Sequence, residues 1–362
     1  MTEEAKYLEL YKKHRPQSWR DIIGQNRIVG SLKSAVKANK VPGAYLFTGP
    51  RGCGKTSAAL VLAAAINCEN EKARAKGDAC GSCAVCINIQ NHNQLGINYI
   101  SMANQGGVDA VRKIVDQARL AQPVNKSVWI LDEAHNLSDA AWDALLIPLE
   151  SATMPALFIF CSTEAHKIPA PIMSRIQARN FGLVDATTMK SYIEQISESD
   201  ELDLNEEQID AAIRLGRGSV RDTLTELESI ISTGSYEESI NEGLLIAIQN
   251  ADIIGVLKAV NSYAGTGEKM RYLAEDLYSD LRDILLLRTR GGEELVAGSP
   301  ITDLKAFKEK VPASQHIAIL DAVGEAVTSM SVGAAEHRII LEAALLKAVQ
   351  RLKRAHKAAE GE

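Results

Sequence analysis

The chain has 362 residues, of which 46% are hydrophobic and 24% are charged, with a net charge of −6 and a pI near 5.8. This composition is typical of a globular protein of two or three domains, and the acidic balance excludes a surface that grips nucleic acid everywhere. Aromatic residues make up only 5% of the chain, which disfavours stacking platforms for single strands. Since the sequence has no run of eighteen apolar residues and opens with an acidic, polar segment, we expect a cytoplasmic protein without a membrane partner.

Local basic segments are compatible with this overall charge. They lie at residues 12–15, at Arg112-Lys113 with Arg119, and in the tail at 347–357. Phosphate contacts are made by individual Lys and Arg side chains, so such a segment could meet DNA. Each is equally well explained as a solvated helix face, and no single DNA-contacting residue is assigned.

Up to about Val184, short apolar runs alternate with longer amphipathic stretches. Such alternation is typical of parallel strands joined by crossover helices. The runs at residues 44–48, 128–132 and 157–162 are almost continuously apolar, as expected for strands covered on both faces. We therefore predict an α/β fold with a parallel sheet in this part of the chain.

A complete phosphate-binding motif follows the first of these runs. Residues 49–56 read G-P-R-G-C-G-K-T, which matches G-x-x-x-x-G-K-[ST] between a predicted strand and a predicted helix. The glycines let backbone N–H groups surround a β-phosphate at the helix N-terminus. Lys55 can reach the β- and γ-oxygens of ATP, and the Thr56 hydroxyl can hold Mg²⁺. The residues expected to bind the nucleotide here are Gly49, Gly52, Cys53, Gly54, Lys55, Thr56 and Ser57.

Four of the six cysteines cluster at Cys68, Cys80, Cys83 and Cys86. The spacing C-x11-C-x2-C-x2-C requires the intervening chain to loop around a centre, and four thiolates suit a tetrahedral Zn²⁺ in a reducing compartment. An iron–sulfur cluster is the main alternative, although the C-x3-C-P continuation is missing, and unliganded or disulfide-bonded cysteines are another. With no His or Glu in the ligand set, we expect a closed, structural zinc site. The other two, Cys53 and Cys161, are expected to be packing residues.

Asp132 and Glu133 stand at the carboxyl end of the predicted strand 128–132. Ligands of open parallel sheets bind at that edge. Asp132 is expected to complete the Mg²⁺ shell through water, and Glu133 to orient and polarise an attacking water. Two acids can also simply end a strand, but the phosphate loop in the same predicted sheet favours the functional interpretation.

Beyond Ala186 the pattern becomes helical. Short helices are predicted to about Gly234, with Asn205 and Gln208 as a capping box, Ser219 as an N-cap, and Gly216 and Gly234 as helix ends. The stretch 191–210 is acidic and lacks Lys and Arg, so we do not expect it to face DNA.

From about Asn241 helical periodicity is sustained, which predicts a bundle that packs against neighbours. The clearest helical segments are residues 253–263, 270–288, 317–330 and 334–357. The predicted domains are therefore residues 1–184, 185–240 and 241–362.

The letters D-E-A-H at residues 132–135 are also the signature of a helicase superfamily, and C-S-T at 161–163 stands close to that group's Ser-Ala-Thr motif. Those helicases require a second α/β domain with its own arginine-rich motif. Because the sequence after Val184 predicts only helices, one of the two required domains is missing.

Taken together, the motifs resemble the clamp-loader branch of the AAA+ ATPases. The opening R-P-Q-S-W-R-D-I-I-G-Q at residues 15–25 is similar to that family's nucleotide-base box, and a phosphate loop followed by a four-cysteine insertion is a combination peculiar to it. K-I-P at 167–169 leading to Ser174-Arg175 resembles the arginine-finger segment, and G-S-V-R-D at 218–222 resembles the second sensor motif. The match covers roughly residues 7–240, and the helical remainder matches only in length and character.

The resemblance implies an AAA+ P-loop domain with a zinc insertion at 68–86, a small helical lid domain and a C-terminal helical collar. It implies that Thr163 is the first sensor, that Arg175 reaches the nucleotide of the next subunit, and that Arg221 touches the γ-phosphate in its own. Without the family, each arginine would be interpreted as part of a surface ion pair. The residues implied to border the base are Arg15, Pro16, Ile22 and Ile23.

The resemblance also implies a function: the ATPase subunit of a DNA sliding-clamp loader, assembled with other clamp-loader subunits in a hetero-oligomeric ring. ATP binding would open the sliding clamp and enclose primer–template DNA, and hydrolysis would release both. An arginine finger supplied by a neighbour can be worth ~10³–10⁵ in rate, so hydrolysis would require assembly. The alternatives are a DNA helicase or branch-migration AAA+ motor, and a non-hydrolysing scaffold subunit.

Two departures from the family pattern bear on these expectations. The family commonly has Ser-Arg-Cys where this chain has Ser174-Arg175-Ile176, but the cysteine carries no charge and the finger is expected to persist. The chain also stops near the end of the third predicted domain, without the polymerase-binding extension of longer relatives. Direct tethering to a polymerase is therefore not expected.

Overall fold

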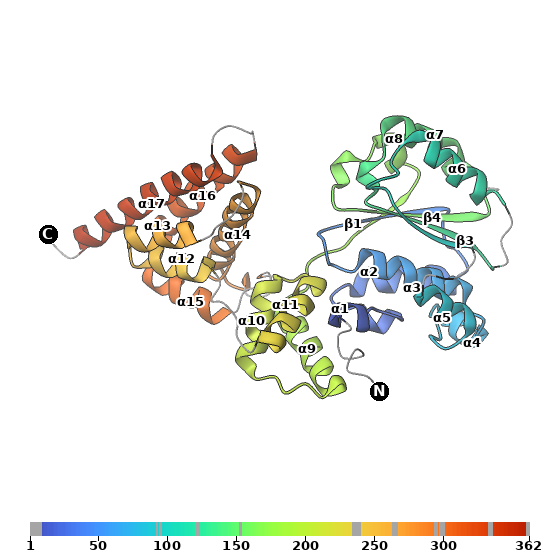
Figure 1. Cartoon of the computed structure of the whole chain (residues 1–362), viewed down its shortest axis with the longest axis horizontal. Helices are drawn as coiled ribbons and strands as arrows, with labels where there is room; N and C mark the ends of the chain where they lie inside the picture. Colours follow the sequence, from blue (N-terminus) through green and yellow to red (C-terminus); the bar gives the residue numbers. More distant parts are fainter. Residues whose placement is uncertain are drawn as a thin grey trace. The chain divides into compact units, whose positions relative to one another are not determined.

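The computed structural model describes residues 9–91, 93, 96–120, 124–151, 154–233, 240–262, 267–292, 296, 301–331 and 336–359 (Figure 1). The chain forms two compact units. Unit 1 is the chain up to Val184 together with Ser219–Thr225, and unit 2 is Asp185–Gly218 together with the chain from Glu226 onward. The predicted collar and most of the predicted lid belong to unit 2, whereas Ser219–Thr225 of the lid belongs to unit 1, and the division into three domains remains a prediction.

Unit 1 is built on a five-stranded sheet whose strand order is β2-β3-β4-β1-β5. The strands are β1 (Ala44–Thr48), β2 (Ile97–Ser101), β3 (Ser127–Asp132), β4 (Ala156–Ser162) and β5 (Gln177–Asn180). All neighbouring strands are parallel, and the register places Ser101 beside Asp132 and Thr48 beside Ser162. The carboxyl ends of the strands therefore meet at one edge, and the predicted parallel α/β fold is confirmed.

The two edge strands were not predicted from the sequence. The central strands β1 and β4 are buried along their whole length, and β3 up to its last residue. By contrast β2 reads I-N-Y-I-S and has no buried residue, and β5 reads Q-A-R-N and is mostly exposed. Because edge strands lack a neighbour on one side, they are under less demand for continuous apolar sequence.

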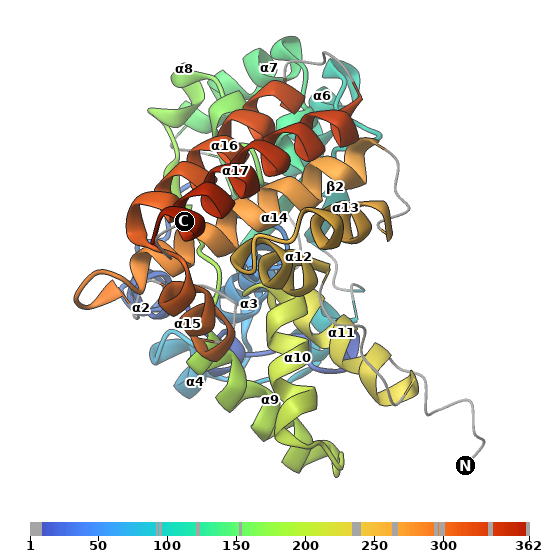
Figure 2. The same ribbon diagram turned by 90° about the vertical axis from the view of Figure 1, so that its left-hand side faces the viewer.

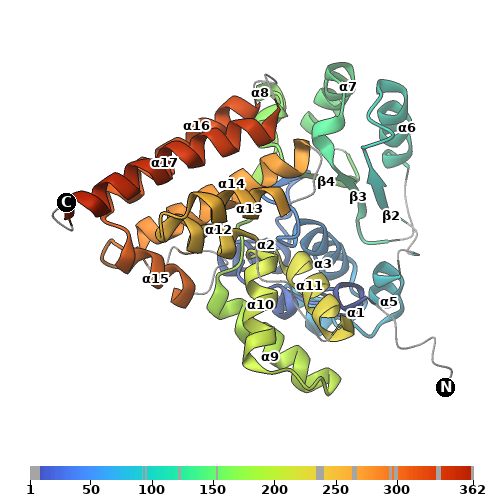
Figure 3. The ribbon, with the colours of Figure 1, turned by 60° about the vertical axis from the view of Figure 1, so that its left-hand side comes forward.

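Helices cover both faces of the sheet (Figure 1). One face packs through Tyr45 and Phe47 of β1 against α2, α3 and α5, and the other packs through Phe158 and Phe160 of β4 against α6, α7 and α8. Figure 3 shows α6 and α7 together on that second face. The helices of unit 1 are α1 (Leu10–Lys13), η2 (Trp19–Asp21), α2 (Asn26–Lys37), α3 (Lys55–Asn67), α4 (Glu71–Ala75), α5 (Ala84–Gln90), α6 (Val108–Ala118), η3 (Ala134–Asn136), α7 (Asp139–Glu150), η4 (Ala165–Lys167) and α8 (Ala170–Met173).

The described residues of unit 2 form helices and the loops between them, and in Figure 2 the long helices α14, α16 and α17 lie side by side. Their apolar faces share one core that includes Leu277, Val323 and Leu345. The helices are α9 (Ala186–Asp200), α10 (Glu206–Gly216), α11 (Val220–Thr233), α12 (Ile240–Gln249), α13 (Ile253–Ser262), α14 (Gly267–Leu286), α15 (Ile301–Lys310), α16 (Ala313–Ser331) and α17 (His337–Ala359), and the start of α11 belongs to unit 1. The predicted helical C-terminal region is confirmed, although α12 and α15 were not among the predicted segments.

Some of the predicted helix ends are confirmed by the structure. Asn205 and Gln208 form the capping box of α10, and the Ser219 hydroxyl accepts from the Asp222 amide at 3.3 Å before α11. Helix α10 ends at Gly216, but the left-handed residue after it is Arg217, with φ 49°. Gly234 lies outside the described residues. Among the helices described, none is long and apolar enough to cross a membrane.

Candidate nucleotide site and cysteine cluster

A pocket of about 960 Å³ opens at the carboxyl edge of the sheet in unit 1. This volume is at the upper end of the usual range for small-molecule sites. The predicted site residues that line it are Arg15, Pro16, Ile22, Ile23, Gly52, Cys53, Gly54, Lys55, Thr56, Ser57, Asp132, Glu133, Thr163 and Arg221. The fold therefore brings together residues that lie more than 200 positions apart in the sequence, all within one compact unit.

The phosphate loop joins β1 to α3 in a conformation that depends on glycine. Gly52 has φ 73°, and a Cβ at this position would overlap the Ser219 hydroxyl, so a larger residue would be both strained and obstructed. Gly49 has φ 137°, and a Cβ there would overlap the Phe181 carbonyl. Glycine is therefore required at both positions for the loop to pass this close to Phe181 and Ser219.

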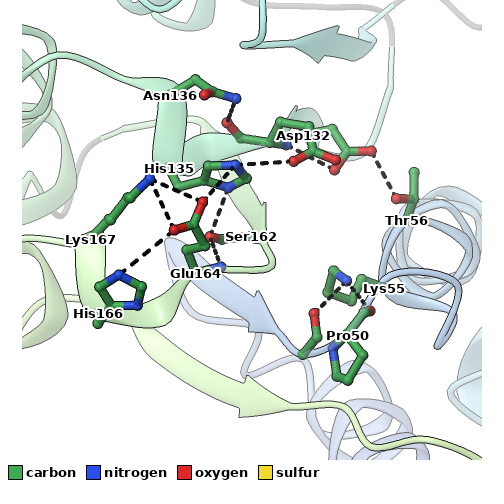
Figure 4. A network of polar contacts seen from close by, with 12 residues as sticks. Pro50, Lys55, Thr56, Asp132, His135, Asn136, Ser162, Glu164, His166 and Lys167 are labelled. Atoms are coloured by element: carbon green, nitrogen blue, oxygen red, sulfur yellow. Dashed lines mark hydrogen bonds and ion pairs between the residues drawn. The ribbon is translucent and has the colours of Figure 1, made fainter. Parts of the chain in front are cut away.

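Lys55 is held by its own loop. It is the first residue of α3 and only 8% exposed, and its ammonium donates to the carbonyls of Gly49 at 2.8 Å and Pro50 at 2.6 Å (Figure 4). A buried ammonium requires such partners because an unpaired charge is costly. Phosphate oxygens could replace these carbonyls as acceptors.

The Asp132 carboxylate is held by three donors. The hydroxyls of Thr56 and Tyr99 donate to Oδ2 at 2.9 and 2.8 Å, and the Glu133 amide donates to Oδ1 at 2.9 Å. Burial and the Asp132 charge raise the pKa of Tyr99, so its hydroxyl remains a donor at neutral pH. A carboxylate with this many bonds is suited to hold a magnesium ion indirectly, through water and the Thr56 hydroxyl.

Glu133 has a backbone conformation that is rare outside glycine, with φ 54° and ψ 42°. His135 lies beside it: its Nε2 is 3.4 Å from the Glu133 carboxylate and 3.5 Å from that of Glu164, and its Nδ1 is 3.2 Å from the Ser162 hydroxyl (Figure 4). Glu164 also pairs with Lys167 at 2.9 Å. The strained backbone directs the Glu133 side chain toward this network at the pocket edge.

Arg221 enters the pocket from the Ser219–Thr225 segment of unit 1. Its guanidinium lies over the ring of Tyr11 in α1, 4.8 Å from the ring centroid, in a cation–π arrangement. Arg15 lies in the same pocket, where burial lowers its pKa and the Tyr99 and Asp132 side chains oppose that effect. The described pocket is thus lined by three arginines, two lysines and three acidic residues, which are Arg15, Arg51, Arg221, Lys12, Lys55, Asp21, Asp132 and Glu133.

Two predicted residues are not among those that line the described pocket. Gly49 contributes its carbonyl to Lys55 instead. Arg175 follows α8 and pairs with Glu150 at the end of α7, with its Nε 2.6 Å from Oε1, and it also donates to the Ser174 hydroxyl at 3.0 Å. Arg175 therefore does not line the described pocket of its own chain.

Several lining residues were missed by the sequence analysis, among them Tyr11, Gln90, Tyr99 and Ser101. Tyr99 and Ser101 belong to β2, and the rule that placed Asp132 at the sheet edge would have found them had this strand been recognised. Gln90 ends α5, the helix of the cysteine insertion, and nothing in its sequence context indicates a pocket residue.

The four clustered cysteines converge as predicted. The sulfur atoms of Cys68, Cys80, Cys83 and Cys86 all lie within 4.8 Å of one another. Tetrahedral Zn²⁺ with Zn–S bonds of about 2.3 Å requires S···S separations of about 3.8 Å, so the arrangement fits the ion after small adjustments. None of these cysteines forms a disulfide.

Backbone amides surround these sulfurs. The amide of Cys80 donates to Cys68 at 3.3 Å, that of Cys83 to Cys80 at 3.3 Å, and that of Cys86 to Cys83 at 3.4 Å. Burial raises the pKa of Cys68 and of Cys86, while at Cys80 the donors on Ser82 and Cys83 outweigh burial and lower the pKa to about 6. Such amide donors are the usual support of metal-bound thiolates.

Comparison with known proteins agrees with the motifs. The family described as DNA polymerase III, delta subunit, matches residues 24–184. The chain is 31% identical to DNA polymerase III subunit tau of Bacillus subtilis over 95% of its own length and 63% of that protein. It is also 31% identical to the gamma/tau subunit of Mycobacterium tuberculosis, over 78% of its own length and 51% of that protein. The chain thus spans between about half and two thirds of these relatives.

A solved structure from Thermotoga maritima, a DNA polymerase III gamma subunit-related protein, aligns with 90% of this chain and 99% of its own, at 13% identity and a TM-score of 0.43. That score is too low to carry an argument about the fold. The relationship to the DNA polymerase III subunits rests on the sequence matches and on the motifs whose residues meet in the pocket and in the cysteine cluster. The chain is a relative of the clamp-loader AAA+ proteins, specifically of the bacterial DNA polymerase III gamma/tau subunits.

Proposed function

We propose that the chain is an ATPase subunit of a sliding-clamp loader. The observation that carries this proposal is the convergence of Lys55, Thr56, Asp132, Glu133 and Arg221 on one pocket in a relative of the gamma/tau subunits. A scaffold that does not hydrolyse ATP would not need an acidic residue, Glu133, in the pocket beside Thr56 and Asp132.

Each residue has a distinct task in this proposal. The Lys55 ammonium exchanges the carbonyls of Gly49 and Pro50 for β- and γ-phosphate oxygens. Thr56 and Asp132 would hold a magnesium ion, which would neutralise phosphate charge when bound. Glu133 orients and polarises the attacking water, and rotation away from His135 brings its carboxylate toward the phosphates.

Three further residues complete the site. Thr163, directly after β4, senses the γ-phosphate, and Arg221 contacts the γ-phosphate from the same chain. Arg175 acts on the nucleotide of the neighbouring subunit after it exchanges Glu150 for phosphate. Arg15, Pro16, Ile22 and Ile23 border the base.

The proposed partners are other clamp-loader subunits in a hetero-oligomeric ring, a sliding clamp and primer–template DNA, in the cytoplasm. The helices from residue 241 on would form the collar of that ring. ATP binding would open the clamp and enclose the DNA, and hydrolysis would release both. DNA would be gripped by its backbone and shape, which a local basic face can do despite the net charge of −6.

The proposal is tested by ATPase assays on the protein purified with the products of its neighbouring genes. We expect clamp and primer–template together to stimulate hydrolysis several-fold, with double-stranded blunt DNA as the control. Directional strand separation by the chain without clamp stimulation would instead support a helicase or branch-migration motor. ATP binding without any turnover in the assembled complex would support a scaffold subunit.

A further inference from the structure

The nucleotide pocket and the cysteine cluster stand at the two ends of one helix. Helix α3 begins with Lys55 and Thr56 and ends at Asn67, and the next residue, Cys68, is its C-cap. Its 13 residues span about 20 Å. Eleven of them are buried, so the helix is fixed on all sides and cannot shift at one end without repacking along its length.

A second helix also connects the two sites. Helix α5 has Cys83 as its N-cap and contains Cys86, and its last residue, Gln90, lines the nucleotide pocket. Cys86 is fully buried and Ile89 is 2% exposed, and α5 packs directly on α3. Cys53 of the phosphate loop, Cys68, Cys86 and Ile89 belong to a single hydrophobic core.

The rest of the insertion is fastened to the body of unit 1. The Trp19 indole donates to the Gly77 carbonyl at 2.9 Å in a buried bond, and Lys33 pairs with Asp78 at 2.9 Å. Trp19 is in η2, directly before Ile22 and Ile23 of the pocket wall. The insertion is therefore an integrated part of the unit, with connections to two sides of the pocket.

We propose that the metal-loaded cysteine cluster is a positioning element of the nucleotide pocket, which acts by holding α5 so that Gln90 faces the ligand. This inference rests on one part of the proposed function, which is that the pocket binds a nucleotide. A helix of seven residues is not stable alone. Ligation of Cys83 and Cys86 fixes the first turn of α5, and the amide of Gln90 is thereby presented at the other end.

Such an arrangement couples the two binding equilibria, and the coupling is reciprocal. If metal makes the pocket fit the nucleotide better, bound nucleotide must hold the metal more tightly by the same factor. Couplings of this kind are typically about fivefold or more. The metal side offers a readout that does not depend on hydrolysis.

The test measures the affinity for zinc by equilibrium competition with a chromogenic chelator, with and without saturating Mg-ADP, and the affinity for a fluorescent ADP analogue by direct titration. We expect saturating ADP to raise the affinity for zinc about fivefold, and this gain is the protection of zinc by ADP. Gln90→Ala is expected to bind ADP several-fold more weakly and, at equal ADP occupancy, to lose more than half of the protection of zinc. Asn91→Ala is the matched control, because Asn91 is an exposed amide next to Gln90 and does not line the described pocket.

The comparison at equal occupancy separates the proposed coupling from the general stabilisation that any ligand gives a fold. An unchanged affinity for zinc on ADP saturation of the wild type would overturn the inference and leave the proposed function intact. Gln90→Ala protein with wild-type ADP affinity and full protection would overturn it as well. Failure of the zinc-loaded wild type to bind ADP at all would overturn the proposed function, and the inference with it.

Discussion

The two ends of helix α3 lie at two different kinds of binding site, an open pocket and a closed cluster of cysteines. At its start, Lys55 and Thr56 open into a pocket of about 960 Å³ whose charged groups are held by exchangeable partners within the chain. At its end, Cys68 joins three other cysteines whose sulfurs lie within 4.8 Å of one another and whose donors are backbone amides. The first arrangement leaves room for substrate and water, and the second leaves room only for an ion.

This difference indicates how each end can work. In the open pocket, a ligand must replace existing hydrogen bonds, such as those from Lys55 to the loop carbonyls. These bonds can form again when the ligand leaves, so we expect ligand binding to be reversible. In the cluster, four thiolates would fill the coordination shell and no position remains for water, so the ion stabilises structure without catalysing a reaction. Substitutions at the two ends should therefore have different main effects, with only the several-fold coupling proposed above between them.

The largest expected effect concerns Arg175, which belongs to neither end. Arg175→Ala is expected to bind ATP normally and to reduce hydrolysis at the neighbouring subunit by about 10³-fold or more, because the finger stabilises charge on the departing phosphate. A mixture with Lys55→Ala subunits should regain activity, with a maximum in ATPase rate as the ratio is varied at fixed total concentration. Mixtures that stay inactive at every ratio despite proven subunit exchange would contradict action in trans, as would a fully active Arg175→Ala protein.

Glu133→Gln is expected to lower the hydrolysis rate by about 10²–10⁴-fold, as is usual for the loss of general-base assistance. Nucleotide affinity should stay within about twofold of wild type, because the amide keeps the size of the side chain and the described partners of the Lys55 ammonium are Gly49, Pro50 and Cys53. Single-turnover hydrolysis and equilibrium titration measure the two quantities separately. A parallel loss of affinity and rate would show that Glu133 serves binding instead.

Lys55→Ala is expected to weaken nucleotide binding by roughly 100-fold, the equivalent of one or two charge-assisted hydrogen bonds. Zinc content should not change, since the substitution leaves the far end of α3 in place. Isothermal titration with ADP and metal analysis of the same sample check both statements. Lys113→Ala, an exposed lysine on α6, is the control and should bind like wild type.

Cys86→Ser is expected to abolish stoichiometric zinc, lower the thermal midpoint by several degrees, and weaken nucleotide binding only several-fold. The wild type should hold about one zinc per chain and be colourless, because four thiolates close the shell of a metal without visible transitions. Cys161→Ala, a buried cysteine outside the cluster, should keep its zinc. A visible charge-transfer band with stoichiometric iron would establish the iron–sulfur alternative.

Much of the fold could be predicted because its decisive features are local. The phosphate loop carries its glycines in a fixed order, and the buried strands β1, β3 and β4 are apolar over their length. The cysteine spacing predicted a convergent cluster because few other arrangements satisfy it. The capping box at Asn205 and Gln208 was predictable for the same reason, since both partners lie within one turn.

The missed features depend on contacts between distant residues. Strand β5 has no apolar pattern of its own, and its place is set by pairing with β1. Tyr99 donates to Asp132 across 33 positions, and Gln90 reaches the pocket only because the insertion folds back on α3. The pairing of Arg175 with Glu150 likewise follows from the packing of α7 against α8, which sequence patterns do not encode.

The central claim is that the Lys55 end of α3 binds nucleotide and the Cys68 end binds zinc, so that each ligand can be lost without the other. Native mass spectrometry of the zinc-loaded chain with Mg-ADP tests this claim most directly. We predict one zinc and one nucleotide per wild-type chain. Lys55→Ala should keep the zinc and lose most of the nucleotide, whereas Cys86→Ser should lose the zinc and still bind nucleotide at high concentration. A wild-type chain that binds no nucleotide, or a Lys55→Ala chain that loses zinc together with nucleotide, would contradict the account.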